Sequence, residues 1–139
     1  MAAALQAQIK TSEKYNRELF EQWHIADPEA VSLTKAATEY INFGREVSEE
    51  MSPVYLLIAM LPCEKLWGWL ANEIRSRIDA TNIYSFWIEE HLISVSTLTN
   101  FIDDNAERYD VDLDTAVYVY QKALSLEVNF FQSATQGTS

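Results

Sequence analysis

Residues 52–78 read SPVYLLIAMLPCEKLWGWLANEIRSRI, a mostly apolar run that contains the one cysteine of the chain. Ser52-Pro53 is a strong helix start, because proline is favoured at the first helical position. The longest apolar part, Val54–Pro62, is too short to cross a bilayer. Pro62 removes a backbone hydrogen bond inside the helix, so we expect a kink beside Cys63. The segment therefore predicts one long helix that ends near Ile78.

The rest of the chain divides into further helices joined by short connections. Apolar residues at helical spacing predict helices over residues 3–23, from about 34 to 47, over 82–109 in one or two pieces, and from Asp112 or Asp114 to Ala134. Asp27-Pro28 is expected to end the first helix, and Thr34 has the side chain of an N-cap. No segment alternates with period two. We therefore predict an all-α helical bundle, a single domain over residues 1–139 with a flexible tail at 135–139.

Apolar stripes on these helices indicate which side chains face the interior. They comprise Leu33, Ala36, Tyr40, Phe43 and Val47; then Leu56, Met60, Cys63, Trp67, Leu70, Ile74 and Ile78; then Tyr84, Trp87, His91 and Val95; and finally Tyr120, Ala123, Leu124, Glu127 and Phe131. Polar and reactive groups thus share the inner faces with apolar ones. A small polar pocket inside the bundle is one arrangement that would collect them.

Composition excludes several function classes. The chain has 21 acidic and 10 basic residues, a formal net charge of -11, and no run of Lys or Arg. This balance argues against nucleic acid and anionic membranes as partners. Met1–Gln8 lacks the basic and long apolar regions of a signal peptide, so a cytoplasmic protein is expected. One cysteine and two histidines argue against a metal site, and no cofactor motif is present.

Cys63 and Glu127 each allow more than one interpretation. Cys63 is an inert core residue, a reactive thiol or an intermolecular link, and the first is the commonest outcome. Glu127 on an apolar stripe should be partly desolvated and able to exchange protons near neutrality. Alternatively, it is a solvated carboxylate paired with Lys122 or an arginine. Tyr40 and His91 are either pocket residues or core side chains with satisfied hydrogen bonds.

Four elements, in order along the chain, resemble the TenA family of the haem-oxygenase-like superfamily. They are Tyr40, the Leu61-Pro62-Cys63 element, the Tyr84-Ser85-Phe86-Trp87-Ile88 element, and the terminal Ser125–Phe131 segment. The third element fits the family's Y-x-x-W-I pattern, and the fourth looks like its terminal S-x-x-E-x-x-F-W helix. The resemblance covers roughly residues 10–134 and implies a haem-oxygenase-like bundle.

The resemblance also implies a thiaminase II or aminopyrimidine aminohydrolase activity in thiamin pyrimidine salvage. Cys63 would be the nucleophile that adds to the pyrimidine ring, and Glu127 the general acid and base. The substrate-binding residues would be Tyr40, Trp67, Tyr84, His91 and Phe130. The expected ligand is a small aminopyrimidine, with no cofactor and no metal.

The chain departs from the family pattern at Trp67, where the family has a tyrosine, and at His91, which replaces another pocket tyrosine. The family's N-terminal helices, with an aspartate that grips the aminopyrimidine, have no counterpart in Met1–Trp23. We therefore expect a homo-oligomer or a partner that covers the place of those helices, and an enzyme incomplete on its own. The alternative is a catalytically silent ligand-binding or interaction module.

Overall fold

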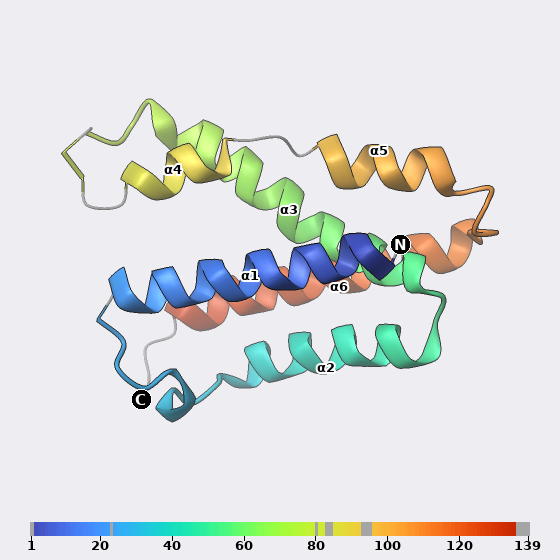
Figure 1. Ribbon diagram of the computed structural model, residues 1–139, viewed down its shortest axis with the longest axis horizontal. Helices are drawn as coiled ribbons and strands as arrows, with labels where there is room; N and C mark the ends of the chain where they lie inside the picture. Colours follow the sequence, from blue (N-terminus) through green and yellow to red (C-terminus); the bar gives the residue numbers. More distant parts are fainter. Residues whose placement is uncertain (1, 23, 80, 83–84, 93–95, 136–139) are drawn as a thin grey trace. The chain divides into compact units, whose positions relative to one another are not determined.

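The computed structural model of the chain describes residues 2–22, 24–79, 81–82, 85–92 and 96–135. The chain divides into two units, Met1–Leu33 and Thr34–Ser139. The elements, coloured along the chain in Figure 1, are α1 (Ala2–Gln22) and the 3₁₀ helix η1 (Pro28–Ala30) in the first unit, and α2 (Lys35–Glu50), α3 (Pro53–Arg75), α4 (Ser85–His91), α5 (Ser96–Asn105) and α6 (Leu113–Thr135) in the second. No strand occurs among the described residues, so the all-α prediction is confirmed.

The sequence predicted that Asp27-Pro28 ends α1. In the structure, His24 sets the end of this helix instead. His24 has a φ of 55°, in the left-handed region. Its backbone N–H donates to the carbonyl of Glu21 at 3.2 Å, and that of Ile25 donates to the carbonyl of Phe20 at 2.8 Å. These two bonds form a Schellman motif, which closes a helix by satisfying its last carbonyls. The helix therefore stops before the proline can act on it.

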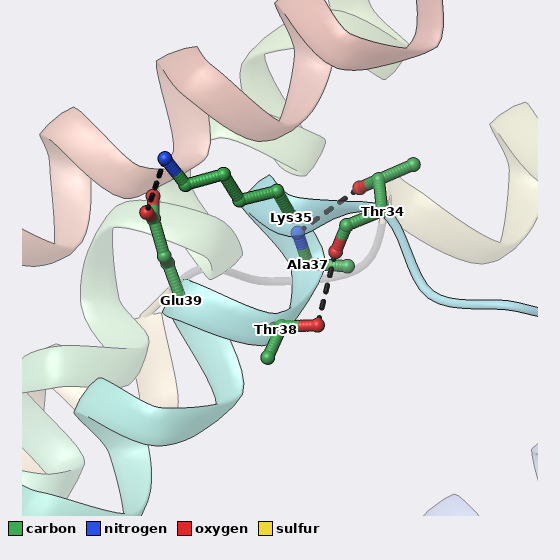
Figure 2. A network of polar contacts seen from close by, with 5 residues as sticks. All are labelled: Thr34, Lys35, Ala37, Thr38 and Glu39. Atoms are coloured by element: carbon green, nitrogen blue, oxygen red, sulfur yellow. Dashed lines mark hydrogen bonds and ion pairs between the residues drawn. The ribbon is translucent and has the colours of Figure 1, made fainter. Parts of the chain in front are cut away.

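Thr34 caps α2, as predicted. Its hydroxyl accepts a hydrogen bond from the backbone N–H of Ala37 at 3.1 Å, and its carbonyl accepts one from the Thr38 hydroxyl at 3.1 Å (Figure 2). Lys35 and Glu39, one turn apart, form an ion pair of 3.7 Å in the same view. Both side chains are exposed, so this pair adds little stability. The cap is therefore the main local signal that fixes where α2 begins.

The long helix α3 begins at Pro53, as predicted, and continues through Pro62. It ends at Arg75 rather than near Ile78. In the described part of the chain, α3 alone is long and apolar enough to span a membrane by length and composition. However, α3 packs against α2, α4, α5 and α6. A core helix of a soluble protein passes the same length and composition test, so the packing accounts for its apolar character.

The buried face of α3 differs from the predicted stripe. Met60 is 38 % exposed, and Cys63 and Trp67 are only half-buried. The buried residues are Val54, Tyr55, Leu57, Ile58, Ala59, Leu61, Pro62, Gly68 and Ala71. In the first half of α3, the helix's own apolar side chains point in every direction around its axis. Their spacing alone therefore does not define one inner face. Leu33, before α2, and Leu124, on α6, were also predicted to face the interior, but they are 60 % and 41 % exposed.

The core of the second unit lies where α3, α6 and α2 meet, with α4 and α5 packed on α3. The carboxylate of Asp112 accepts the backbone N–H of Thr115 at 2.8 Å and its hydroxyl at 2.6 Å, which starts α6 at the predicted place. These hydrogen bonds hold the pKa of Asp112 below its usual value. The backbone N–H of Asp112 donates to the hydroxyl of Tyr55 on α3 at 2.9 Å. Tyr55 thus ties the start of α6 to the start of α3.

We predict that Tyr55→Phe lowers the free energy of unfolding by about 1 kcal/mol, because it removes the acceptor of the Asp112 N–H and keeps the buried ring. Urea unfolding followed by circular dichroism measures this. Tyr118→Phe, at a hydroxyl-bearing side chain 53 % exposed on α6, is the matched control and should unfold as the unmodified chain does. Equal stability of all three proteins would show that the Tyr55 hydroxyl contributes nothing.

Candidate active site

The site is built around the carboxylate of Glu127, which is 2 % exposed. Glu127 lies on the face of α6 that also buries Val119, Ala123 and Leu126. Ion pairs among the described residues all join exposed side chains, and Glu127 takes part in none of them. A buried carboxylate without a basic partner costs folding free energy unless hydrogen bonds satisfy it. The alternative of a solvated Glu127 paired with Lys122 is therefore excluded.

Tyr40 of α2 supplies one of these hydrogen bonds. Its hydroxyl donates to Oε1 of Glu127 at 2.6 Å. Tyr40 follows Ala36 by one turn, so it shares the inner face of α2 with Phe43 and Val47. Burial and the neighbouring Glu127 raise the pKa of Tyr40 far above its usual value. The proton therefore stays on the tyrosine, which acts as a permanent donor to the carboxylate.

Cys63 of α3 is the second neighbour of Glu127, and their side chains share a hydrogen bond. A carboxylate accepts only, so the thiol donates. Burial, the negative charge of Glu127 and this hydrogen bond, in that order, raise the pKa of Cys63 to about 12. The structure thus brings together a thiol, a carboxylate and a phenol that come from three different helices.

Trp67 lies one turn beyond Cys63 on α3 and contacts the same sulfur. Its indole N–H donates to Sγ of Cys63 at 3.0 Å. This hydrogen bond acts against the burial of the thiol and lowers its pKa. Trp67 stands where the family has a tyrosine, so it cannot offer that residue's hydroxyl. In the structure, the indole N–H is a hydrogen-bond donor at this position.

Three rings surround Trp67. Its ring centroid lies 5.1 Å from that of Trp87, 5.8 Å from His91 and 5.4 Å from Phe131. Trp87 and His91 are themselves stacked, with centroids 4.2 Å apart. Nδ1 of His91 lies 2.7 Å from the carbonyl oxygen of Trp87. Because a carbonyl only accepts, Nδ1 carries a proton and donates this hydrogen bond.

The predicted site residues are not all placed in the same way. Tyr40, Cys63, Trp67, His91 and Glu127 form one connected network, joined by the hydrogen bonds and ring contacts above.

Phe130 is 38 % exposed, and its ring meets that of Phe131 at 5.9 Å. Tyr84 lies outside the described residues, as do Trp23 and Val95.

Two contacts were missed by the sequence analysis, those of Trp87 and Phe131 with Trp67. Both residues had been placed on apolar stripes, which was the signal available for including them in the site. Among the described residues, no three His, Cys, Asp or Glu side chains gather closely enough to hold a metal ion. The chemistry that the arrangement itself offers is proton exchange between a thiol and a buried carboxylate, beside aromatic rings.

Comparison with known proteins identifies the family of the chain. A sequence profile described as the TENA/THI-4/PQQC family matches residues 1–137. This match is wider than the resemblance over roughly 10–134 and includes α1. No curated protein sequence matches the chain. The family has a helical, haem-oxygenase-like fold and supports a thiamin-related role in broad terms. The chain therefore belongs to the TENA/THI-4/PQQC family.

Proposed function

We propose that the chain hydrolyses an aminopyrimidine of thiamin pyrimidine salvage, with Cys63 as nucleophile and Glu127 as general acid and base. The observation that carries the proposal is the buried Glu127 carboxylate, which accepts hydrogen bonds from both the Tyr40 hydroxyl and the Cys63 thiol. No basic side chain among the described residues pairs with this carboxylate, and proton transfer from the thiol is a use that explains its burial.

The reaction begins with transfer of the thiol proton to Glu127, in which the S–H bond breaks and an O–H bond forms. The sulfur adds to an electron-poor carbon of the pyrimidine, and the π electrons of the ring move to a ring nitrogen. That nitrogen takes the proton from Glu127. The protonated amino group leaves as ammonia, and water adds to the carbon it has left and gives a proton to Glu127. The C–S bond then breaks: Glu127 returns its proton to the sulfur and takes the one on the ring nitrogen, which releases the hydroxymethyl product and restores the thiol. That last proton passes to ammonia, which restores the carboxylate. Tyr40 keeps its proton throughout and holds the carboxylate in place.

The aromatic residues suit a flat heterocyclic substrate. Trp67, Trp87 and Phe131 offer ring faces and edges near the sulfur, and stacking on such surfaces orients a planar ring. Nδ1 of His91 is engaged with the Trp87 carbonyl, so Nε2 is the ring nitrogen that would contact a polar group of the substrate. We propose these residues, together with Tyr84 and Phe130, as the substrate-binding set.

A second candidate function is a silent relative that binds a ligand or a partner without turning it over. The observation that favours it is the pKa of Cys63, about 12, since only about one thiol in 100,000 is ionised at pH 7 with that value.

A homo-oligomer, or a partner that covers the place of the family's N-terminal helices, remains a prediction, as does a cytoplasmic location. Light scattering on the purified chain tests the oligomer: a monodisperse monomer would contradict it.

We predict that Cys63→Ser abolishes turnover of 4-amino-5-aminomethyl-2-methylpyrimidine, because a hydroxyl in this place is a far weaker nucleophile. Release of ammonia measures turnover, and calorimetric titration with the same compound measures binding. The variant is expected to bind without turnover. Trp69→Phe, at a side chain 59 % exposed on the same helix, is the control and should retain activity.

The outcomes separate the two candidate functions. A fully active Cys63→Ser protein would exclude Cys63 as the nucleophile. Saturable binding by the unmodified chain, without turnover, would favour the silent relative. If neither binding nor turnover is found in a folded protein, an interaction role is the better explanation.

We predict that Glu127→Gln has opposite effects on turnover and on simple thiol chemistry. Turnover falls, because the amide cannot take the thiol proton. Alkylation by iodoacetamide at pH 8 becomes faster by about tenfold or more, because removing a neighbouring negative charge lowers the thiol pKa. In the unmodified chain, the alkylation rate should rise about tenfold per pH unit from pH 7 to 10 without levelling off, since the thiol pKa lies above this range.

Glu64→Gln is the matched control for Glu127→Gln. Glu64 is next to Cys63 in the chain, and its charge raises the thiol pKa least of the causes named for that group. Its replacement should change alkylation only slightly and leave turnover intact. Equal effects of both substitutions on alkylation would show that the contact between Glu127 and Cys63 has no special role.

A further inference from the structure

We propose that Trp67 is a positioning residue for Cys63: its indole N–H fixes the direction of the thiol proton and then holds the sulfur anion. The inference rests on the proposed function for the role of Cys63 as nucleophile. It adds a residue that acts through Cys63 rather than on the substrate. Trp67 donates to Sγ at 3.0 Å from one helical turn away, so both groups are held on the same helix.

The direction of the thiol proton follows from what each neighbour can do. An indole N–H only donates, and a carboxylate only accepts. The sulfur therefore receives the hydrogen bond from Trp67 and gives its own proton to Glu127. If Trp67 carried an acceptor instead, the thiol proton could turn away from the carboxylate. The pair of neighbours thus holds the S–H bond along the path of proton transfer.

The same N–H stabilises the product of that transfer. When the proton moves, the S–H bond breaks and an O–H bond forms on Glu127, which leaves a sulfur anion beside the Trp67 N–H. Hydrogen bonds to a charged acceptor are shorter and stronger than those to a neutral one. Trp67 therefore favours the thiolate over the thiol, against the effect of burial.

The aromatic neighbours of Trp67 explain how the donor is kept in place. Trp87 meets its ring edge-on with an interplanar angle of 66°, and His91 and Phe131 lie against it at 48° and 58°. These rings come from α4 and α6, whereas Trp67 and Cys63 share α3. An indole held from two other helices loses little further freedom when it donates its hydrogen bond. The ring cluster thus contributes to the chemistry of the sulfur through Trp67.

The test is alkylation of Cys63 by iodoacetamide in the free protein, measured from pH 7 to 10. Trp67→Phe keeps an aromatic ring and removes the donor, so we expect a rate about three- to tenfold lower at every pH in this range. Trp67→Tyr returns a donor hydroxyl and should recover part of the rate. Trp69→Phe, two residues away and exposed, is the matched control and should leave the profile unchanged.

A role in packing alone gives the opposite sign. Loss of packing around Trp67 would expose Cys63 to reagent and solvent, which raises the alkylation rate. A rate that is unchanged or higher in Trp67→Phe, with the far-ultraviolet circular dichroism of the unmodified chain, would overturn the proposal. No aminopyrimidine is present, so this result is independent of whether the proposed hydrolysis is found. A lower rate together with no turnover would keep the Trp67 assignment and reject the hydrolase.

Discussion

The burial of the Glu127 carboxylate is the constraint on which the second unit depends. A carboxylate that is 2 % exposed must have hydrogen-bond donors, and no cation is paired with it among the described residues. Its donors, Tyr40 and Cys63, come from α2 and α3. The three helices that meet at this group are also those that form the core. Any displacement of α2 or α3 from α6 would therefore leave a buried charge without partners, which is costly.

Much of the fold could be predicted, because local sequence signals set where its helices begin. Thr34 and Asp112 start helices through side-chain caps, and Pro53 starts one as its first residue. None of these signals needs a tertiary contact. The inner face of α3 could not be predicted, since apolar residues lie all around it and only its four partner helices select the buried ones. His24 shows the same limit at the end of α1: a left-handed residue that is not glycine leaves little trace in the sequence.

Some contacts of the site could likewise be predicted from the sequence, and others could not. The contact between Cys63 and Trp67 follows from a spacing of four residues on one helix, so the sequence already contained it. The pairing of Glu127 with Tyr40 joins residues 87 positions apart. The apolar stripes placed both side chains inside the bundle, but only the tertiary structure shows that they are hydrogen-bonded to each other. Phe131, rather than Phe130, reaches Trp67. Neighbouring residues point about 100° apart on a helix, and a family pattern does not fix the rotation of α6 near its end.

The raised pKa of Cys63 and the proposed role of Glu127 are linked. Burial, first, and the negative charge of Glu127, second, keep the thiol protonated in the free protein, and the same charge makes Glu127 able to receive that proton. Once the proton has moved, the carboxyl group is neutral, and the repulsion that opposed the thiolate disappears. The sulfur anion then faces two donors, the carboxyl O–H and the Trp67 N–H, in a partly buried setting where such bonds are strong. A thiol that stays protonated until its own carboxylate takes the proton is therefore consistent with a nucleophile as well as with a silent core residue. The proton-accepting role of Glu127 is what distinguishes the two.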